Sequence, residues 1–344
     1  MKVNFKDLDS GEIEEWFTNQ GLDAYRGRQV RQWLYKKLAF SFDEMSNLPK
    51  SIRSLLTDKA CINNLEKIKA EVSEDGTEKY LFKLIDGHLI ESVLIPEKDH
   101  FTICISSQAG CTMGCRFCLT AKQGFNRNLT SAEIIDQVIV VKRSMDTPDR
   151  LTNIVLMGMG EPLDNYSAVL MAMKNLISND GMNFSHRKVT LSTCGIAPLI
   201  KKLGEDIQVN LAVSLNAADD KTRNFLMPIN RRYPIKTLIS ACRDFALPNR
   251  SMITFEYILI KGINDRDRDA YNIIRILSGL KAKINLIPLN PHHSLKMTPP
   301  SMEEILHFRQ ILIDNHFTAI IRKSKGEDIL AACGQLSGRH NKME

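Results

Sequence analysis

The spacing of hydrophobic and polar positions changes along the chain and separates its first 95 residues into two regions. In residues 1 to about 60, apolar side chains recur at helical spacing and predict short helices at 12–19, 27–39 and 51–60. Residues 66–95 instead contain short β-rich runs, which predict strands at 70–73, 79–84 and 88–95. Asp75-Gly76 and Asp86-Gly87 separate these strands, and Asp-Gly pairs are typical of hairpin turns.

From about residue 100, short apolar runs alternate with segments of helical spacing. The apolar runs lie at 101–105, 153–157, 188–192, 209–215, 253–260, 283–287 and 318–321. The helical segments between most of them include 131–143, 166–177, 235–246 and 267–280. Strands that alternate with helices predict a parallel sheet, and about six such units suit an open or complete α/β barrel. We expect an α/β fold with a partial (βα)6 TIM-like barrel, a small helical N-terminal domain and a short β extension.

The predicted elements divide the chain into four parts without an internal repeat or a disordered linker. Residues 1–65 form a helical accessory domain, and residues 66–96 form a β-hairpin linker region. Residues 97–326 form the core barrel, and residues 327–344 form a C-terminal segment that carries Cys333. In such barrels the chemistry takes place at the carboxyl ends of the strands.

Composition narrows the class of protein only a little. The 344 residues are 43% hydrophobic and 25% charged, as in an ordinary soluble globular protein. No run of 18 apolar residues is present, and the first residues lack the apolar stretch of a secretory signal. We therefore expect a cytoplasmic protein without a membrane segment. The net charge of +6 permits an anionic partner such as RNA but does not identify one.

Three of the eight cysteines lie within eight residues, in the spacing C-x3-C-x2-C, just after the first barrel strand. Thiolates are the ligands that iron–sulfur clusters need, and Cys111, Cys115 and Cys118 could hold one face of a 4Fe-4S cubane. The fourth iron would stay open to the amino and carboxylate groups of S-adenosylmethionine. The alternative is a zinc knuckle, but structural zinc normally takes four ligands and no second pair is suitably placed. The spacing resembles that of the radical S-adenosylmethionine (SAM) superfamily.

Small and polar residues follow several of the predicted barrel strands. The segment 157–162 is a glycine-rich turn, and the resemblance to the superfamily implies that Gly160 and Glu161 bind the amino group of the cofactor's methionine part. Without the resemblance, a segment of this composition would more often be only a tight turn. The other strand-end residues are Ser192, Ser214, Leu215, Asn216 and Asn290. Each alone is more typical of a helix N-cap, but together they favour a cofactor site at the barrel mouth.

Five segments give a closer resemblance, to the RlmN family of radical SAM enzymes that methylate C2 of adenine in RNA. They are ISSQ at 105–108, QGFNRNL at 123–129, MGMGEPL at 157–163, INLIP at 284–288 and AACGQL at 331–336, and the likeness extends over nearly the whole chain. It implies methylation of an adenosine in the peptidyl-transferase centre of 23S ribosomal RNA. For some members it also implies methylation of the adenosine 3′ of the anticodon in certain transfer RNAs.

The resemblance also implies a chemical route that uses two molecules of S-adenosylmethionine per turnover. Cys333 takes a methyl group from the first, and the cluster cleaves the second to a 5′-deoxyadenosyl radical. A methylene radical formed on Cys333 adds to C2, and Glu91 accepts the C2 proton. Attack by the Cys104 thiol then releases the RNA product and leaves a Cys104–Cys333 disulfide. From the residues alone, Cys104 and Cys333 are more simply core cysteines, and Glu91 lies either on the solvent face of a strand or at a functional site.

Two alternative functions remain open at this point. Cfr-type enzymes methylate C8 of the same ribosomal adenosine and share the two distant cysteines, although the segments GEPL and FNRNL favour C2. The other alternative is a non-enzymatic iron–sulfur or zinc protein that binds RNA, for which Cys104 and Cys333 would be dispensable. Two positions depart from the family pattern: Asn216 stands where many members have histidine, and Leu330 where an acidic residue is common.

The expected partners are 23S ribosomal RNA, transfer RNA and an electron donor such as flavodoxin or ferredoxin, and we expect a monomer. Residues 25–37 mix cations with aromatics, which suits an RNA-binding role for the N-terminal domain. A solvated helix whose aromatics pack inward explains the same residues equally well. Arg127, Arg231 and Arg232 are further candidates for RNA contact.

Overall fold

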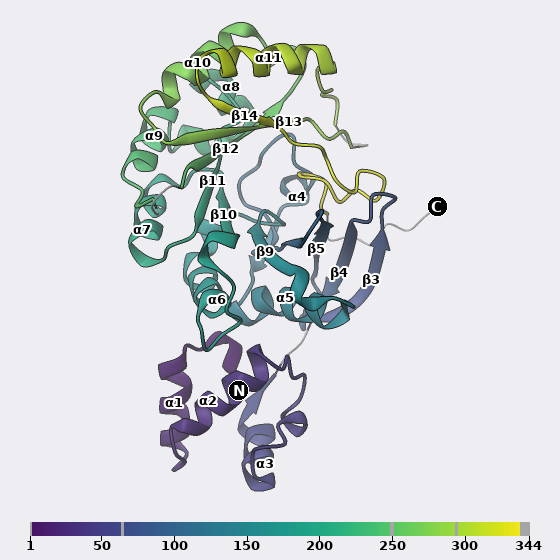
Figure 1. Cartoon of the computed structure of the whole chain (residues 1–344), viewed down its shortest axis with the longest axis vertical. Helices are drawn as coiled ribbons and strands as arrows, with labels where there is room; N and C mark the ends of the chain where they lie inside the picture. Colours follow the sequence, from purple (N-terminus) through teal and green to yellow (C-terminus); the bar gives the residue numbers. More distant parts are fainter. Residues whose placement is uncertain (1, 63–64, 248–250, 293–294, 338–344) are drawn as a thin grey trace.

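The N-terminal domain is a compact group of helices, drawn at the bottom of Figure 1. The computed structural model describes residues 2–62, 65–247, 251–292 and 295–337. A capping box begins the first helix, with Asp9 Oδ1 accepting from Glu12 N and Glu12 Oε2 accepting from Asp9 N, both at 2.8 Å. The helices are α1 (Ser10–Asn19), α2 (Tyr25–Tyr35) and α3 (Lys50–Lys59), and the parallel strands β1 (Val3–Asn4) and β2 (Ala60–Cys61) join the two ends of the domain.

An open sheet of ten strands is the centre of the second part of the described fold. Its parallel strands are β6 (Phe101–Cys104), β9 (Leu151–Leu156), β10 (Val189–Thr193), β11 (Asn210–Ser214), β12 (Ile253–Leu259), β13 (Ala282–Pro288) and β14 (Thr318–Ile321). The antiparallel strands β5 (Leu89–Pro96), β4 (Glu78–Lys83) and β3 (Glu66–Val72) continue the same sheet beyond β6. The predicted partial barrel with a β extension is confirmed.

Helices cover the outer face of the parallel strands (Figure 1), as expected for a barrel built from βα units. They are α5 (Ser131–Ser144), α6 (Tyr166–Ile177), α7 (Ala197–Asp206), α8 (Asp220–Leu226), α9 (Ile235–Arg243), α10 (Asp267–Leu277) and α11 (Met302–Asp314). Short 3-10 turns lie at Phe5–Asp7, Phe42–Glu44, Pro148–Arg150, Pro162–Asn165, His186–Lys188 and Pro228–Arg231. In the described part of the chain, no helix is both long enough and apolar enough to span a bilayer.

Buried polar contacts join the N-terminal domain to the barrel helices α5 and α6. The Lys6 ammonium pairs with Asp136 of α5, and both side chains are almost fully buried. Arg31 of α2 donates to Asp180 Oδ2 at 2.8 Å and to Asn175 Oδ1 at 3.1 Å. Buried ion pairs add little net stability, but their directional contacts can fix the orientation of the domain.

A small two-stranded hairpin brackets the loop that carries the three clustered cysteines. Strands β7 (Gln108–Gly110) and β8 (Phe125–Asn128) pair on either side of the loop, which contains the short helix α4 (Leu119–Lys122). Gly110 has a φ of +84°, and a Cβ there would lie 2.0 Å from the carbonyl oxygen of Gly124. Only glycine fits this close approach. The hairpin therefore brings the two ends of the cysteine loop together.

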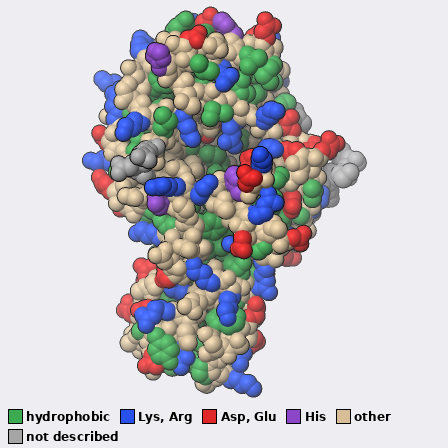
Figure 2. All heavy atoms as spheres, in the orientation of Figure 1, with side chains coloured by type: hydrophobic (Ala, Val, Ile, Leu, Met, Phe, Trp, Pro, Cys, Tyr) green, Lys and Arg blue, Asp and Glu red, His purple; other side chains and the backbone are tan. Residues whose placement is uncertain are grey.

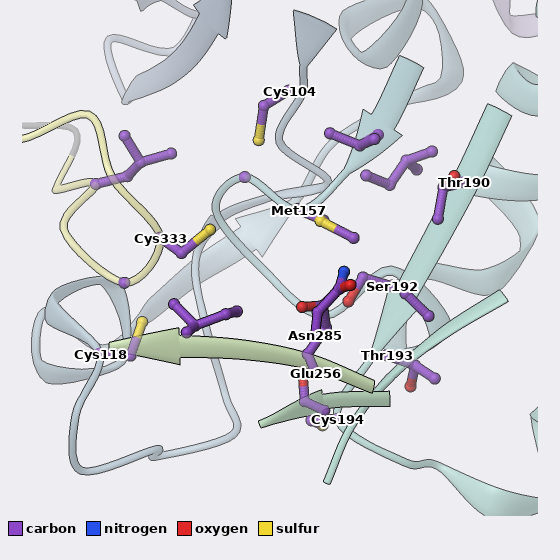
Figure 3. A pocket seen from close by; sticks show the side chains of 18 of the residues that line it. Cys104, Cys118, Met157, Thr190, Ser192, Thr193, Cys194, Glu256, Asn285 and Cys333 are labelled. Atoms are coloured by element: carbon purple, nitrogen blue, oxygen red, sulfur yellow. The ribbon is translucent and has the colours of Figure 1, made fainter. Parts of the chain in front are cut away.

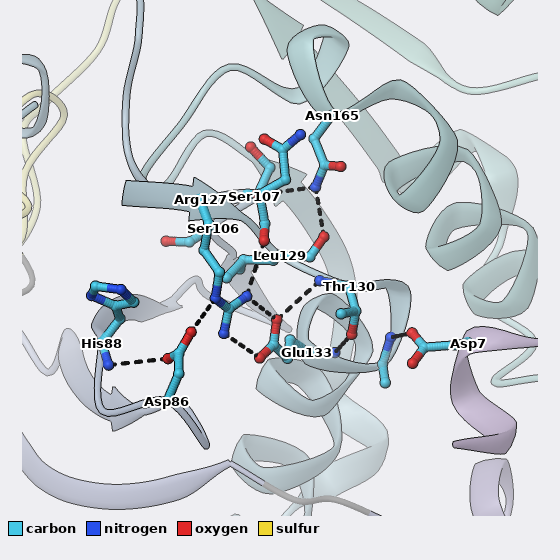
Figure 4. A network of polar contacts seen from close by, with 12 residues as sticks. Asp7, Asp86, His88, Ser106, Ser107, Arg127, Leu129, Thr130, Glu133 and Asn165 are labelled. Atoms are coloured by element: carbon cyan, nitrogen blue, oxygen red, sulfur yellow. Dashed lines mark hydrogen bonds and ion pairs between the residues drawn. The ribbon is translucent and has the colours of Figure 1, made fainter. Parts of the chain in front are cut away.

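Arg127 of β8 fixes the hairpin to its surroundings (Figure 4). Its guanidinium donates two hydrogen bonds of 2.7 Å to the Glu133 carboxylate and also pairs with Asp86. Glu133 lies in the first turn of α5, and Asp86 lies in the turn between β4 and β5. These bidentate, charge-assisted contacts connect the cysteine loop to both the barrel and the β extension.

Candidate active site

A cavity of about 540 Å³ opens at the carboxyl ends of the parallel strands and extends into the barrel interior. Its size suits a cofactor-sized ligand. The predicted residues that line it are Cys104, Cys111, Cys115, Cys118, Gly160, Glu161, Ser192, Ser214, Asn216 and Cys333. Glu91, Leu215 and Asn290 are not among the residues that line it.

The thiols of Cys111, Cys115 and Cys118 are half-buried at the cavity wall. Burial raises the pKa of Cys111 to about 12 and that of Cys115 well above its usual value, so a bound cation is needed to stabilise the thiolates. Among the described residues, no three His, Cys, Asp or Glu side chains are placed to share one metal ion. A cubane binds each thiolate through a different iron, so the three-cysteine set fits an iron–sulfur cluster.

Two segments distant in sequence hold the cysteine loop. On one side, Arg116 N donates to Leu226 O at 2.9 Å, at the end of α8. On the other side, Leu119 N donates to Gly334 O at 2.7 Å, and Thr120 Oγ1 donates to the backbone oxygen of Leu336 at 2.7 Å. The loop therefore lies between α8 and the C-terminal segment that carries Cys333.

The glycine-rich turn after β9 joins two strand ends through Glu161. Its carboxylate accepts hydrogen bonds from Thr193 Oγ1 and Cys194 N, both at 2.7 Å, and from Leu163 N at 3.1 Å. Burial raises the pKa of this carboxyl, and the hydrogen bonds to the carboxylate oppose that rise. Gly160, at φ +102°, leaves no room for a Cβ, which would lie 2.6 Å from the Gln108 side chain.

The ends of β10 and β11 present the predicted small polar groups to the cavity through Ser192 and Ser214. Asn216 has a left-handed φ of +54°, which asparagine tolerates better than most residues. Its Oδ1 accepts from Ile258 N at 2.9 Å, so the side chain also fastens β11 to β12. Leu215 contributes only backbone contacts here, because its side chain is buried away from the cavity.

Cys333 and Cys104 face one another across the cavity. Figure 3 shows both sulfur atoms pointing into the space between the C-terminal segment and β6. Cys333 is accessible to water within the cavity yet enclosed by protein, and this burial raises the pKa of its thiol, as it does for Cys104. Asn290 Nδ2 donates to Cys333 O at 3.1 Å, so Asn290 holds the segment in place.

Glu91 of β5 contacts the C-terminal segment from the β extension. Its Oε2 accepts a 2.6 Å hydrogen bond from Ser337 N, and its Oε1 lies 3.7 Å from the Lys79 ammonium. In this conformation Glu91 contacts the segment that bears Cys333, and its role as proton acceptor stays a prediction.

Other polar residues of the barrel interior were not predicted from the sequence. Glu256 and Asn285 line the cavity from β12 and β13, and Asn285 Nδ2 donates to Glu256 Oε1 at 3.0 Å. Burial raises the pKa of Glu256. Thr254 and Lys283 line the cavity two positions earlier on the same strands. Polar residues at every second position of an otherwise apolar strand are the pattern that could have identified them.

The candidate RNA-contacting residues separate into two groups. Arg31 and Tyr35 of α2 are buried, and the Arg127 guanidinium forms ion pairs with the carboxylates of Asp86 and Glu133. The exposed cations among the candidates are Arg28, Lys36, Lys37, Arg231 and Arg232, and the aromatic Tyr25 is exposed as well. Figure 2 shows further Lys and Arg side chains around the hollow at the centre of this face and over the N-terminal domain.

Two family models match separate parts of the chain. The family model described as the Radical SAM superfamily matches residues 105–273. A second family model, described as the ribosomal RNA large subunit methyltransferase N-terminal domain, matches residues 3–62.

Several curated proteins resemble the chain over almost its full length. One is the "Dual-specificity RNA methyltransferase RlmN" of Syntrophus aciditrophicus, 49% identical over 98% of this chain and 97% of that protein. The protein of the same name from Desulfosudis oleivorans is 50% identical over 98% of this chain and 91% of that protein. The crystal structure of a radical SAM methyltransferase from Sphaerobacter thermophilus superposes with a TM-score of 0.93. It is 44% identical and covers 98% of this chain and all of that one.

Proposed function

This chain belongs to the RlmN family of radical SAM RNA methyltransferases, and from that premise we propose that it methylates C2 of adenosine in 23S ribosomal RNA and, in some transfer RNAs, of the adenosine 3′ of the anticodon. Its cofactors are those of the family, a 4Fe-4S cluster and S-adenosylmethionine. The observation that carries the proposal is that Cys104 and Cys333 line the same cavity as the three-cysteine loop.

Each group of residues has a separate task in this proposal. Cys111, Cys115 and Cys118 hold the cluster, which supplies the electron that cleaves S-adenosylmethionine when both are bound. The strand ends at Gly160, Ser192, Ser214 and Asn216 hold the cofactor, and Glu161 keeps the neighbouring turns together.

The two facing cysteines account for the covalent steps. Cys333 accepts and presents the methyl group, because its thiol lies in the cavity on a segment anchored at both sides. Cys104 lies opposite on strand β6, where its thiolate can attack the Cys333 sulfur. This attack forms a Cys104–Cys333 disulfide and breaks the bond from the Cys333 sulfur to the transferred carbon, which takes up a proton as the methylated RNA leaves. An external reductant then restores both thiols.

The N-terminal domain is proposed to bind the RNA outside the barrel. Its exposed cations neutralise phosphates, and its docking through Lys6 and Arg31 keeps that surface at a fixed position relative to the cavity mouth. The printed name "dual-specificity RNA methyltransferase" of the relatives supports a substrate range of more than one RNA.

The test is to identify the modified nucleoside. The protein is purified without oxygen, its cluster is reconstituted, and it is incubated with S-adenosylmethionine, a reductant and protein-free 23S RNA or transfer RNA. Digestion and mass spectrometry against standards should give 2-methyladenosine from both RNAs. Cys333→Ala should abolish the product, whereas Cys242→Ala, a buried cysteine outside the cavity, should retain it.

Two other outcomes would change the proposal in different ways. Formation of 8-methyladenosine would reject C2 and move the chain to Cfr-type chemistry with the same cysteines. Cleavage of S-adenosylmethionine without any modified adenosine would reject the RNA substrates while leaving the cofactor assignment in place.

A further inference from the structure

Arg223 is a fully buried arginine that binds the ends of two barrel strands, and the helix that carries it contacts the cysteine loop at Leu226. We propose that it is a positioning residue for both cofactors: its hydrogen bonds fix the backbone beside the S-adenosylmethionine site, and its charge compensates the anionic cluster. The proposal rests on the assignment of Cys111, Cys115 and Cys118 as cluster ligands, and it is independent of which adenine carbon is methylated.

The guanidinium uses its three nitrogens to hold three backbone carbonyls and one amide. Nε donates to Leu215 O at 3.0 Å, and Nη2 donates to Cys194 O at 2.7 Å and to Ser214 O at 3.0 Å. Nη1 donates to Asn230 Oδ1 at 2.9 Å. The three carbonyls belong to the ends of β10 and β11, directly beside the cavity-lining side chains of these strands. One rigid side chain therefore sets the relative position of two strand ends.

The charge of Arg223 is not balanced by a direct ion pair. None of the described Asp or Glu side chains forms a salt bridge with Arg223. Asn230 accepts from Arg223 through Oδ1 and donates through Nδ2 to the exposed Asp220 at 2.9 Å, so it lies between the two charged side chains. Burial accordingly lowers the pKa of the guanidinium. A buried cation is unfavourable unless an anion lies nearby, so this position calls for a negative group in the site.

The cysteine loop supplies that negative group when its thiolates hold iron. Cys194, whose carbonyl accepts from Arg223 Nη2, belongs to one buried cluster with Leu226, against which Cys115 and Cys118 pack. The backbone joins the same parts, because Arg116 N, next to Cys115, donates to Leu226 O at the end of α8, the helix that carries Arg223. Gly195 has a φ of +108°. A Cβ there would lie 3.4 Å from Arg223 Nη2 and 2.9 Å from Leu238 Cδ1, so the lack of a side chain makes room for the guanidinium.

The two roles of Arg223 predict two separate measurable effects. Reduction adds one electron to the cluster, and a buried cation nearby stabilises the more negative, reduced form. Loss of the charge should therefore lower the reduction potential. Loss of the hydrogen-bonding fork should loosen the strand ends and weaken S-adenosylmethionine binding even where the charge is kept, because an ammonium cannot reproduce the planar fork.

The experiment compares three variants after anaerobic reconstitution and iron counting. Arg223→Met removes the charge and the fork, Arg223→Lys keeps only the charge, and Arg31→Met removes a buried arginine far from the cavity. A redox titration followed by electron paramagnetic resonance gives the cluster potential. The change of the same spectrum on adding S-adenosylmethionine gives its Kd.

The expected results differ for each variant. Arg223→Met shifts the reduction equilibrium about tenfold toward the oxidised cluster, which is about 59 mV for one electron, and it weakens S-adenosylmethionine binding about tenfold. Arg223→Lys keeps the potential near that of the native protein but weakens binding to a similar extent. Arg31→Met lowers stability and changes neither quantity.

Unchanged potential and Kd in Arg223→Met would overturn the proposal and leave Arg223 a packing residue. If Arg223→Met does not fold, Arg223→Lys decides, and an unchanged Kd in that variant overturns the proposal. Neither readout uses RNA, so failure of the C2 assignment leaves the result intact. A native protein that binds no cluster through Cys115 would instead reject the ligand assignment itself.

Discussion

Burial raises the pKa of the thiols of Cys104, Cys111, Cys115 and Cys333, so the cavity favours their protonated forms. In the proposed function the loop cysteines become thiolates by binding iron, which supplies the missing positive charge. In the same proposal Cys333 binds no iron, and its deprotonation would be favoured by the cationic sulfonium of the cofactor in the cavity. The same low-polarity surroundings thus serve two different kinds of sulfur chemistry.

Gly110 tests the geometry of the cysteine loop. Gly110→Ala should lower the free energy of unfolding by about 3 kcal/mol, because a left-handed φ of +84° and a backbone oxygen 2.0 Å from the new Cβ both oppose it. Gly279→Ala is the matched control, with a φ of +78° and no atom within 4 Å, and should cost only about 1 kcal/mol. Urea unfolding of the two apo variants measures the difference, and equal losses would contradict the packing described for the loop.

A substitution at Glu161 tests whether its carboxylate holds the glycine-rich turn beside the proposed cofactor site. Glu161→Gln should cost about 2 kcal/mol of stability, because an amide cannot accept all three hydrogen bonds that reach the carboxylate. It should also weaken S-adenosylmethionine binding. The exposed Glu205→Gln should stay within about 0.5 kcal/mol of the native protein in the same unfolding experiment. A neutral effect of Glu161→Gln would mean that the carboxylate does not hold the turn.

At the level of single residues, sequence patterns predicted the groups with a distinctive spacing or turn. The three-cysteine loop and the glycine-rich turn line one cavity, as expected. Arg223 could not be foreseen, because its partners are carbonyl groups of distant strands that leave no trace in side-chain identity. Asn290 was predicted at the cofactor site, but it contacts Cys333 O and lies outside the cavity lining.

At the level of elements, the β extension and the C-terminal segment depend on one another. Asp328 accepts hydrogen bonds from Ser73 Oγ at 2.5 Å and from Glu74 N at 3.2 Å, in the turn between β3 and β4. Lys79 of β4 donates to Ile329 O. These contacts lie a few residues before Cys333, so the extension helps to hold the cysteine over the cavity.

Removal of this anchor should free Cys333. Asp328→Ala should speed alkylation of Cys333 several-fold, measured by mass spectrometry of the iodoacetamide adduct over time, because the segment then opens more often. Asp9→Ala removes a comparable contact at the N-cap of α1, far from the segment, and should leave the rate unchanged. An unchanged rate in Asp328→Ala would show that the core contacts alone position Cys333.

The docking of the N-terminal domain gives a pH dependence. Burial raises the pKa of Asp136 from 3.8 to about 6, despite the opposing charge of Lys6. Between these values the folded protein binds more protons than the unfolded chain, so this group makes stability fall as the pH rises, by up to about 3 kcal/mol.

Urea unfolding of the apo protein and of Asp136→Asn at pH 4.5 and 6.5 checks this sign. The stability of the native protein relative to the variant should be greater at pH 4.5 than at pH 6.5. A difference that does not change with pH would contradict the raised pKa.

Element positions were predicted well where the periodicity was clear. The strand at 318–321 and the helix at 166–177 have the predicted bounds, whereas the predicted helix at 27–39 ends at Tyr35. The left-handed φ of Leu38, just beyond its end, is a backbone state that apolar spacing does not reveal. The β7–β8 hairpin was not predicted, because its short strands are largely polar and are fixed by Arg127 and Glu133.

At the level of the whole molecule, the β extension also explains why the barrel stays open. Alternating strands and helices predicted the parallel sheet but left open whether the barrel closes. Strand β5 pairs with the edge of β6 that β14 would need for closure. Cys333, on the C-terminal segment, lines the cavity of this open barrel.

The central claim is that the methyl carbon reaches RNA through Cys333 within this cavity. The most direct test supplies S-adenosylmethionine with three deuterons on its methyl group and measures the mass of the methyladenosine formed. Transfer through a methylene radical on Cys333 predicts a product that keeps two of the three deuterons. The Cys333→Ala variant should form no methyladenosine. A product that keeps all three deuterons, or one that still forms in Cys333→Ala, would contradict the claim.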